Sequence, residues 1–566
     1  ALPKLISNIR IIKTMRWNAT NVAFSRPIRW LLALHGESAI PFKYAGLTAT
    51  NATRGLRFNH AENLPVADAA YYFETIKAQG ILLNPAERKA SIERQIHALA
   101  KQVGGAIPND PGLLLEVTHL VEAPAALLGE FDPLHLELPR EALISVMKKH
   151  QRYFPVQSAP TPSPGGRGEL LPYFITVANK PEGQYTAVVR GNEDVIRARF
   201  TDAAYFVRED MKKKLADFLP ALDKLTFQAE LGSMRDKAQR IEALAGALAP
   251  LVGLSPEEQA ATARAAQLCK ADLATQMVVE MTSLQGVMGR DYALHSGEAE
   301  DVAVAIFEHY LPRSSDDISP KTKPGLVVGL ADRLDSLAGL FAAGLAPSGN
   351  KDPFALRRAA LGLVGNLIEW NLPLDLQSAL SLAAENLPIE ASPASQAECL
   401  NFVIERLRHI FLEQGYAHDV VDAIVSAQGH NPALASQAVK QLSEWVGRED
   451  WATILPAYSR CVRITRTGDG GPGTEVSAAL FDTDAEDALY AALQTAEAAL
   501  ANDAQRPTVD EFLTAIVPMI PAIDRFFEDV LVMVDDERVR ANRLALLQRI
   551  ANLAKGVADM SKLEGF

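Results

Sequence analysis

The sequence contains little cysteine and no long apolar run. Three of the 566 residues are cysteines, Cys269, Cys399 and Cys461, and no two of them form a CxxC pair. This usage argues against a disulfide framework and against a cysteine-based zinc site, and it favours a reducing compartment. The longest apolar stretches, such as LVVGLADRLDSLAGLFAAGLA, are interrupted by charge, so none is predicted to span a bilayer. We expect a cytoplasmic protein with no membrane partner.

The sequence also has no excess of basic residues. The chain has 56 Lys and Arg against 69 Asp and Glu, which gives a net charge of −13. A protein with this balance does not coat nucleic acid with its whole surface, so any nucleic-acid site has to be found patch by patch. The length predicts three to five domains. The chain begins at ALPKLISNIR without an initiator Met, and we expect a further N-terminal segment to precede it.

Complete catalytic motifs are absent as well. The sequence contains no Walker A motif, GxGxxG fingerprint, GxSxG elbow or HExxH pair, and no HIGH or KMSKS-like pair. The glycine-rich stretch GDGGPG lacks the GxxxxGK[ST] pattern and is predicted to be a loop. A self-sufficient active site is therefore not predicted for this chain.

The patterns that are present change along the chain from mixed to helical. RPIRWLLALHG and AIPFKYAGLTAT are typical of strands, and LISVMKKHQRYFPV and LLPYFITVANK predict a long hairpin around a Pro- and Gly-rich loop. NPAERKASIERQIHALAKQVGG predicts an amphipathic helix. From about residue 196 to 450, apolar residues recur every three or four positions, which predicts helices almost throughout, and a helical bundle follows. The predicted fold class is multidomain α+β.

One set of polar residues resembles a metal centre. The order RDKAQRIEAL, CKADLATQMV, RDYALHSGE and ADRLDSLAG resembles an HD phosphohydrolase domain, in which histidines and aspartates hold a divalent ion that activates water. Asp272 and Asp332 match the two aspartates, but Ala271 replaces one histidine and Asp236 another. His295 is either a remnant of the site or an ordinary helix-end residue. We expect this scaffold without its metal, and a metal-dependent HD-family phosphohydrolase acting on nucleotides is the alternative function.

Several longer stretches together resemble one family, the β subunit of the bacterial heterotetrameric glycyl-tRNA synthetase. They cover nearly the whole chain in order. They are KTMRWNATNVAFSRPIRWLLALHG, TRGLRFNHAE, LLLEVTHLVEAPAALLGEFD, EALISVMKKHQRYFPV, VRGNEDVIRARFTDAAYFVRED, FQAELGSMRDKAQRI, MVVEMTSLQGVMGRDYALHSGEAEDVAVAIFEHYLPR, KDPFALRRAALG and FFEDVLVMVDDERVRANRLALL.

The resemblance implies a subunit of glycine–tRNA ligase that recognises and positions tRNA(Gly) within an α2β2 assembly. A separate α subunit uses ATP and Mg to activate glycine, so no cofactor is expected on this chain and DNA is not an expected partner. The implied domains are a B3/B4-like mixed α/β region (1–225), a degenerate HD-like helical domain (226–345), a helical connecting domain (346–450) and a C-terminal anticodon-binding helical domain of the arginyl-synthetase type (451–566).

The last helical run, DDERVRANRLALLQR, contains the first group of candidate RNA-binding arginines. Arg540 and Arg543 are three residues apart and share a helix face, while Leu544 and Leu547 point toward the core. Guanidinium groups bind phosphates and stack on splayed bases, but they also pair with nearby acids, and both explanations stay open. The candidates in this domain are Arg538, Arg540, Arg543, Arg549, Arg460, Arg463 and Arg466.

Two further basic segments are candidates for the acceptor side of the tRNA. In GNKDPFALRR, Asp352 and Pro353 predict a helix that starts at Phe354, so the two arginines that follow oppose the helix dipole unless a phosphate, solvent or a carboxylate offsets them. MKKHQRYFPV is a basic cluster expected on a strand, in which Phe154 is predicted to be core. The acceptor-side candidates are Lys351, Arg357, Arg358, Lys148, Lys149 and Arg152.

The segment VVRGNEDVIRARF is predicted to form a polar loop. Arg190, Arg197 and Arg199 frame Asn192 in it, and these residues contact either RNA or the α subunit. A third function class, a helical scaffold with no RNA partner, is the remaining alternative for the chain as a whole.

Overall fold

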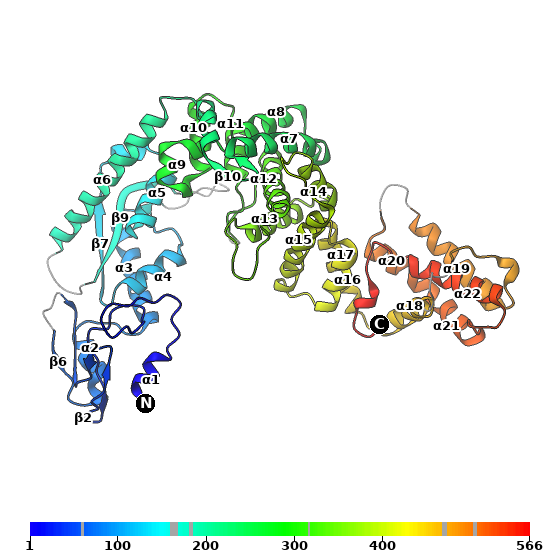
Figure 1. The fold of residues 1–566 in the computed structure, drawn as a ribbon, viewed down its shortest axis with the longest axis horizontal. Coiled ribbons are helices and arrows are strands. Elements are labelled where there is room, and N and C mark those ends of the chain that lie inside the picture. Colours follow the sequence, from blue (N-terminus) through cyan, green and yellow to red (C-terminus); the bar gives the residue numbers. More distant parts are fainter. Residues whose placement is uncertain (58–61, 159–167, 180–184, 315–316, 467–472, 502–505) are drawn as a thin grey trace. The chain divides into compact units, whose positions relative to one another are not determined.

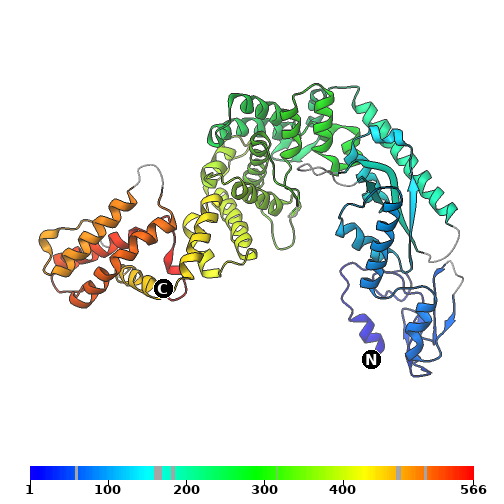
Figure 2. The same cartoon turned by 180° about the vertical axis from the view of Figure 1, so that it is seen from behind.

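The computed structural model describes residues 1–57, 62–158, 168–179, 185–314, 317–466, 473–501 and 506–566. The chain forms two compact units (Figures 1 and 2). Unit 1 comprises Ala1–Lys212 and Glu280–Leu284, and unit 2 comprises Lys213–Val279 and Gln285–Phe566. Within the described ranges, no helix has the length and apolar character needed to cross a membrane. The predicted division into four domains stays a prediction.

The N-terminal part of unit 1 is built from very short antiparallel ladders. They pair β1 (Leu34–His35) with β2 (Ser38–Ala39), β3 (Lys43–Tyr44) with β4 (Leu47–Thr48) and β5 (Ala52–Thr53) with β6 (Leu64–Pro65). Ala45 and Gly46 both have positive φ, which suits the tight turn between β3 and β4. The strands expected here are present, but only as two-residue pairs. Helices α1 (Leu2–Ser7) and α2 (Tyr72–Ala78) complete this part.

A three-stranded antiparallel sheet forms the second part of unit 1. Strand β9 (Leu170–Asn179) lies between β7 (Pro124–Glu130) and β8 (Phe154–Gln157), so the predicted hairpin is confirmed. Helices α3 (Pro85–Gln102) and α4 (Pro111–Leu120) supply the rest of its core. The buried residues Ile92, Ile96 and Ala100 recur every four positions along α3, which confirms the predicted amphipathic helix.

Two segments of unit 1 are helical where a strand and a loop were expected. LISVMKKH belongs to α5 (Arg140–Ser145) and to a π-helical turn (Val146–His150), whose buried residues are Leu143, Val146 and Met147. This spacing fits one helix face rather than an alternating strand. The predicted polar loop around Asn192 lies inside α6 (Thr186–Asp210), a helix that packs on β7.

Unit 2 is almost entirely helical around the central helix α12 (Lys323–Ala342). This helix is buried on nearly all sides because α7, α8, α11, α13, α14 and α15 all pack against it. The run LVVGLADRLDSLAGLF therefore has buried residues on nearly all sides of the helix, and these include the charged Arg333 and Asp335. The surrounding helices are α7 (Met234–Val252), α8 (Pro256–Leu268), α10 (Val287–His295), α11 (Glu300–Glu308), α13 (Leu356–Glu369), α14 (Leu376–Ala384), α15 (Pro393–Glu413), α16 (His418–Gln428) and α17 (Pro432–Val446).

The C-terminal part of unit 2 is the predicted helical bundle. Its helices are α18 (Trp451–Thr465), α19 (Asp484–Leu500), α20 (Val509–Ile516), α21 (Ile520–Asp529) and α22 (Glu537–Asn552). Helix α18 packs along α22, and α19 packs on α21. The three cysteines are free and buried, and burial raises the pKa of each thiol to about 12.

Candidate nucleic-acid interface

Arg543 is a buried residue of α22 that links this helix to α19 in the C-terminal bundle. Its side chain is almost fully buried, and its Nε lies 2.8 Å from Oε1 of Glu486 on α19. The guanidinium also donates to the carbonyl of Leu531. Burial alone would raise the pKa of Glu486, but hydrogen bonds from Arg543 and from the Asp482 backbone lower it. The prediction that Arg543 faces RNA is therefore wrong, because its hydrogen-bonding groups are used inside the fold.

Two other predicted arginines pair with neighbouring helices. Arg549 forms an ion pair with Glu497 of α19, and Arg460 forms one with Asp524 of α21. These partners lie on other helices of the bundle, so the spacing of the arginines alone did not predict them. Both side chains remain partly exposed and contribute to packing between helices.

The start of α22 has more accessible arginines. Arg540 donates to the carbonyl of Val534 at 3.0 Å and lies 3.7 Å from Glu537. The Arg538 side chain is exposed and makes no ion pair or hydrogen bond to any described residue, while its backbone N–H is capped by Asp536. Of the four arginines predicted on this helix, Arg538 is the one whose guanidinium is available to an external anion.

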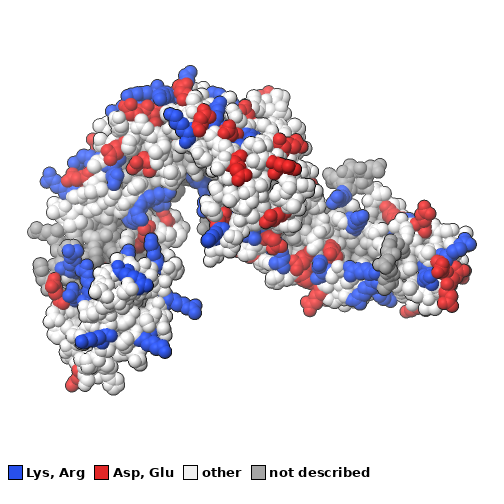
Figure 3. All heavy atoms as spheres, in the orientation of Figure 1, with Lys and Arg blue, Asp and Glu red and all other residues white. Residues whose placement is uncertain are grey.

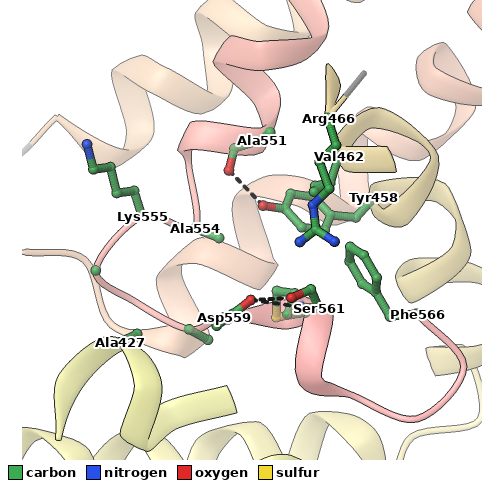
Figure 4. A pocket seen from close by; sticks show the side chains of 13 residues that line it. Ala427, Tyr458, Val462, Arg466, Ala551, Ala554, Lys555, Asp559, Ser561 and Phe566 are labelled. Atoms are coloured by element: carbon green, nitrogen blue, oxygen red, sulfur yellow. Dashed lines mark hydrogen bonds between the residues drawn. The ribbon is translucent and has the colours of Figure 1, made fainter. Parts of the chain in front are cut away.

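A pocket forms where α18, α22 and the C-terminal tail meet (Figure 4). Its volume is about 230 Å³, below the range of about 300–1,000 Å³ typical of drug-sized ligands, so it suits one small planar group. The Tyr458 hydroxyl closes one wall by donating to the carbonyl of Ala551 at 2.8 Å. Because burial raises the pKa of Tyr458, the phenol stays neutral. The lining residues include Arg466, Lys555, Asp559, Ser561 and Phe566.

Cations and an aromatic ring gather at this pocket. The Arg466 guanidinium lies 5.6 Å from the centre of the Phe566 ring, and Arg463 lies 5.7 Å from the same ring while donating to the Phe566 carbonyl. Arg466 and Lys555 are exposed and form no ion pair within the described part of the chain. Asp559 accepts hydrogen bonds through Oδ1 from Ser561. The structure thus brings Arg463 and Arg466 to the same ring, whereas Arg460 pairs with Asp524.

Comparisons with known proteins identify the family of this chain. The family model "Glycyl-tRNA synthetase beta subunit" matches residues 1–426, and "DALR anticodon binding domain" matches residues 454–560, which include the pocket except Ala427, Ser561 and Phe566. The chain belongs to the glycyl-tRNA synthetase β-subunit family. It is 41% identical to the glycine–tRNA ligase β subunit of Moorella thermoacetica and 40% identical to that of Desulforamulus reducens, over 99% of its own length and 81% and 80% of theirs.

A longer relative comes from a plant. The chain is 40% identical over its whole length to glycine–tRNA ligase, chloroplastic/mitochondrial 2, of Arabidopsis thaliana, and it spans 52% of that protein. None of these matches supports the HD phosphohydrolase considered as the alternative function.

The residues predicted for a degenerate HD-like site are not brought together as expected. Asp332 lies between two ammonium groups, 2.9 Å from Lys237 Nζ and 2.7 Å from Lys270 Nζ. Asp236, predicted at the first ligand position, instead caps α7 by accepting from Ser233. The neighbouring Lys237 faces Asp332 because one residue along a helix turns the side chain by about 100°.

The other HD-like positions serve the fold. Asp272 is fully buried and accepts from the backbone N–H groups of Gly286 and Gly289, and burial raises its pKa to about 6. Ala271 is buried, and His295 is exposed with no partner in the described ranges. No group of three or more His, Cys, Asp or Glu suited to a metal ion occurs among the described residues.

Five residues of this buried cluster, Lys237, Arg240, Lys270, His309 and Asp335, were not predicted from the sequence. Lys270 Nζ lies 2.9 Å from Nε2 of His309, and Asp335 binds both Lys237 and Arg240. Burial and the Lys270 charge lower the pKa of His309 well below its ordinary value, so the ring is neutral. Burial would raise the pKa of Asp332, but the charges of Lys237 and Lys270 hold it well below its ordinary value. The sequence did contain a signal for this cluster, because one lysine lies next to Asp236 and another lies next to Ala271.

Some of the candidate side chains in GNKDPFALRR have hydrogen-bond partners within the fold, and others have none among the described residues. The helix starts at Leu356, two residues later than predicted, and the Asp352 carboxylate accepts from the N–H groups of Leu356 and Arg357. This carboxylate already occupies the site where a phosphate was expected. Arg357 donates to the Gly349 carbonyl at 2.6 Å, whereas Arg358 is exposed and its guanidinium has no partner among the described residues.

The candidates on the π-helical turn of unit 1 are mostly engaged in the fold. Lys148 pairs with Asp110, and Arg152, which has a positive φ, pairs with Glu116 at 2.7 Å. Lys149 is exposed. Phe154 is buried, as predicted, but the basic cluster lies before the strand and not on it.

The candidates on α6 also differ in their partners. Asn192 accepts from the Tyr153 hydroxyl and donates to the Val188 carbonyl, so it is structural. Arg197 pairs with Asp194 at 2.8 Å. Arg190 and Arg199 are exposed and make no ion pair with any described residue.

The ion pair of Arg543 generates a stability prediction. We expect Arg543→Gln to lower the free energy of unfolding by about 3–5 kcal/mol, because it leaves the Glu486 carboxylate buried without its partner. Chemical denaturation monitored by circular dichroism measures this change. Arg538→Gln, which removes an exposed arginine from the same helix, is the control and should have little effect. Equal effects of the two substitutions would contradict the assignment.

The buried lysine cluster generates a second prediction. Asp332→Ala removes the carboxylate between two buried ammonium groups and is expected to cost about 3–5 kcal/mol. Asp236→Ala removes only a helix-capping carboxylate and should cost about 1 kcal/mol. Urea denaturation of both variants distinguishes the two positions. A larger loss for Asp236→Ala would show that Asp236, and not Lys237, belongs to the cluster.

Proposed function

We propose that this chain is the tRNA-binding subunit of a glycine–tRNA ligase. It recognises tRNA(Gly) and positions it for ATP-dependent glycylation at the active site of a separate α subunit, in an α2β2 assembly. Membership of the β-subunit family supports this, and so does the absence of nucleotide-binding motifs from the sequence. ATP and Mg are used through the α subunit, and this chain holds no cofactor. Its three free cysteines suit the reducing cytoplasm.

The observation that carries the proposal is the pocket, most of whose lining residues lie in the segment that matches an anticodon-binding domain. Arg466 and Lys555 line it and form no ion pair with a described residue, so their charges are available to RNA phosphates. Phe566 presents an aromatic ring beside them, and single-stranded RNA is commonly recognised by stacking of splayed bases on such rings. A small pocket with a ring and two cations fits one base of the anticodon loop together with its phosphate.

Asp559 gives the same pocket a hydrogen-bond acceptor. Its Oδ1 is engaged by Ser561, while Oδ2 accepts no hydrogen bond from a described residue. A carboxylate accepts from an exocyclic amino group, such as that of cytosine, and uracil has no such group. The proposed specificity of this pocket is therefore for a base with an amino group, with the two cations holding the backbone.

The other unpaired cations are proposed to contact the rest of the tRNA. They are Arg538 in the C-terminal bundle, Lys351 before α13, Arg358 on α13, and Arg190 and Arg199 on α6. Contacts of this kind position the RNA without reading its sequence. For Arg190 and Arg199, the α subunit remains the alternative partner. Arg543 and Asn192 are left out because the fold uses their polar groups.

Two finer points of the architecture belong to the proposal. Residues 226–345 keep an HD-like helical scaffold in which the ammonium groups of Lys237 and Lys270 stand where a metal would be held, supported by their ion pairs with Asp332. Residues 1–225 are proposed to be B3/B4-like, supported by the antiparallel sheet with helices packed on it.

The pocket is tested in the assembled enzyme. Arg466→Gln is expected to raise the KM for tRNA(Gly) by about ten-fold, which corresponds to about 1.4 kcal/mol, because a phosphate or base contact is lost. Adenylate formation in the absence of tRNA should not change, since it takes place on the α subunit. Steady-state aminoacylation and glycine-dependent ATP–pyrophosphate exchange measure the two quantities.

Arg460→Gln is the matched control for this experiment. Arg460 lies on the same helix but is paired with Asp524, so its loss should change the KM for tRNA by less than about three-fold. An Arg466→Gln enzyme with the KM of the unmodified enzyme would refute the role of the pocket.

A further inference from the structure

The first 57 residues have a charge opposite to that of the chain. They contain nine of the 56 Lys and Arg but one of the 69 Asp and Glu, Glu37, so this segment carries +8 in a chain of −13. We call residues 1–57 the basic module. The nine cations are Lys4, Arg10, Lys13, Arg16, Arg26, Arg29, Lys43, Arg54 and Arg57. Figure 3 shows this part of unit 1, at the lower left, with more blue than red on the face in view.

The fold uses few of these cations. All except Arg54 are exposed, and none makes an ion pair with a described residue. Arg16 donates to the Asn21 carbonyl, and Arg54 lies over the Trp30 ring. By contrast, Arg264 of unit 2 pairs with Glu298. A surface of like charges without counter-charges repels itself, and a bound anion relieves this repulsion.

The local structure holds these cations on short turns and ladders. Met15 and Phe24 pair across a turn in which Asn18 accepts from Thr20 and donates to the Ala45 carbonyl at 2.9 Å. This turn carries Arg16. The ladders that follow are two residues long, so much of the backbone between them has no repeating hydrogen bonds. The charges are therefore spread over a surface and do not converge on a closed pocket.

The chemistry of the module favours RNA as the partner. Six of the nine cations are arginines, whose planar groups bind phosphate oxygens in pairs. The Arg54 guanidinium lies 5.1 Å from the centre of the Trp30 ring, and Trp30 is 43% exposed. Such a stacked pair offers a flat surface to a base or ribose. A lipid surface fits less well, because it calls for a long amphipathic helix, and α1 has six residues with one cation.

We infer that the basic module binds the phosphate backbone of the tRNA, as an RNA-binding surface separate from the anticodon pocket. The inference rests on the proposed function, since it takes tRNA(Gly) as the ligand. The module contributes affinity and orientation through phosphate contacts, and it reads no base sequence. An acidic face of a partner protein is the competing occupant.

Binding of the full chain to a tRNA(Gly) transcript at several NaCl concentrations tests the inference. The variant R10Q/R16Q/R26Q/R29Q removes four charges of the module. Each lost phosphate contact lowers the slope of log K against log salt by roughly 0.7–0.9. We therefore expect a slope smaller by about 2–4 and an affinity at least about ten-fold lower in 100 mM salt. The charge-preserving variant R10K/R16K/R26K/R29K should keep most of the slope.

The matched control changes net charge equally without touching the module. In R264Q/R313Q/R408Q/R448Q, each substituted arginine pairs with a carboxylate in unit 2, so the slope should stay within about one of the wild-type value. A second measurement needs no substitution. Bound tRNA should slow acetylation of Lys4, Lys13 and Lys43, quantified by mass spectrometry, and leave Lys224 unaffected.

The outcomes separate the inference from the proposed function. A wild-type chain that binds no tRNA even in low salt refutes the proposed function. A chain that binds tRNA, with the slope of the quadruple Gln variant unchanged and the three lysines unprotected, refutes only this inference. If that variant instead loses affinity for the α subunit alone, the module is a protein-binding surface and the inference is wrong.

Discussion

Four buried cations of unit 2, Lys237, Arg240, Lys270 and Arg543, are bound by carboxylates, and these ion pairs connect the helices that carry them. Arg543 is bound by Glu486, and Asp332 separates the ammonium groups of Lys237 and Lys270. Removing one partner from such a set leaves an uncompensated charge in a medium of low dielectric constant. The helices that carry these residues are therefore fixed relative to one another, and the cations concerned are not available to a ligand.

Ion pairing also identifies the residues that are available. Arg466, Lys555 and the exposed cations of the basic module have no carboxylate partner in the described ranges. In a chain with a net charge of −13, such groups are concentrated in a few places. A polyanion is then attracted to these places and repelled by most of the remaining surface. This arrangement suits a subunit that orients a large folded RNA and leaves bond formation to a partner.

The parts of the fold that depend on local periodicity were predictable from the sequence. The burial of α3 and the pairing of β8 with β9 follow from apolar spacing over a few residues. The strand expected at Val146 and Met147 was wrong, because the buried residues Leu143, Val146 and Met147 have the three- and four-residue spacing of one helix face. Partners far along the chain were not predictable. Glu486 precedes Arg543 by 57 residues, and no local pattern connects them.

The predictions for the candidate site also divide into those that the sequence supported and those that depend on long-range contacts. That the last helices bind RNA followed from the resemblance to a family, whereas the spacing of the arginines left their partners open. Asp236 and Lys237 are adjacent, and only the packing of α7 against α12 shows which of them faces Asp332. The pocket depends on contacts of Phe566 with Arg463 and Arg466. Both arginines lie about a hundred residues before Phe566 in the sequence. Long-range packing of this kind has no signature in a single sequence.

The central claim is that the C-terminal pocket receives the anticodon loop, and site-specific cross-linking tests it most directly. A photoreactive benzoylphenylalanine placed at position 555, on the exposed rim of the pocket, is irradiated in the complex with tRNA(Gly) and the linked nucleotide is mapped. Cross-links confined to the anticodon loop are the predicted result. Cross-links to the acceptor arm, or none in a complex shown to be fully formed, would contradict the account.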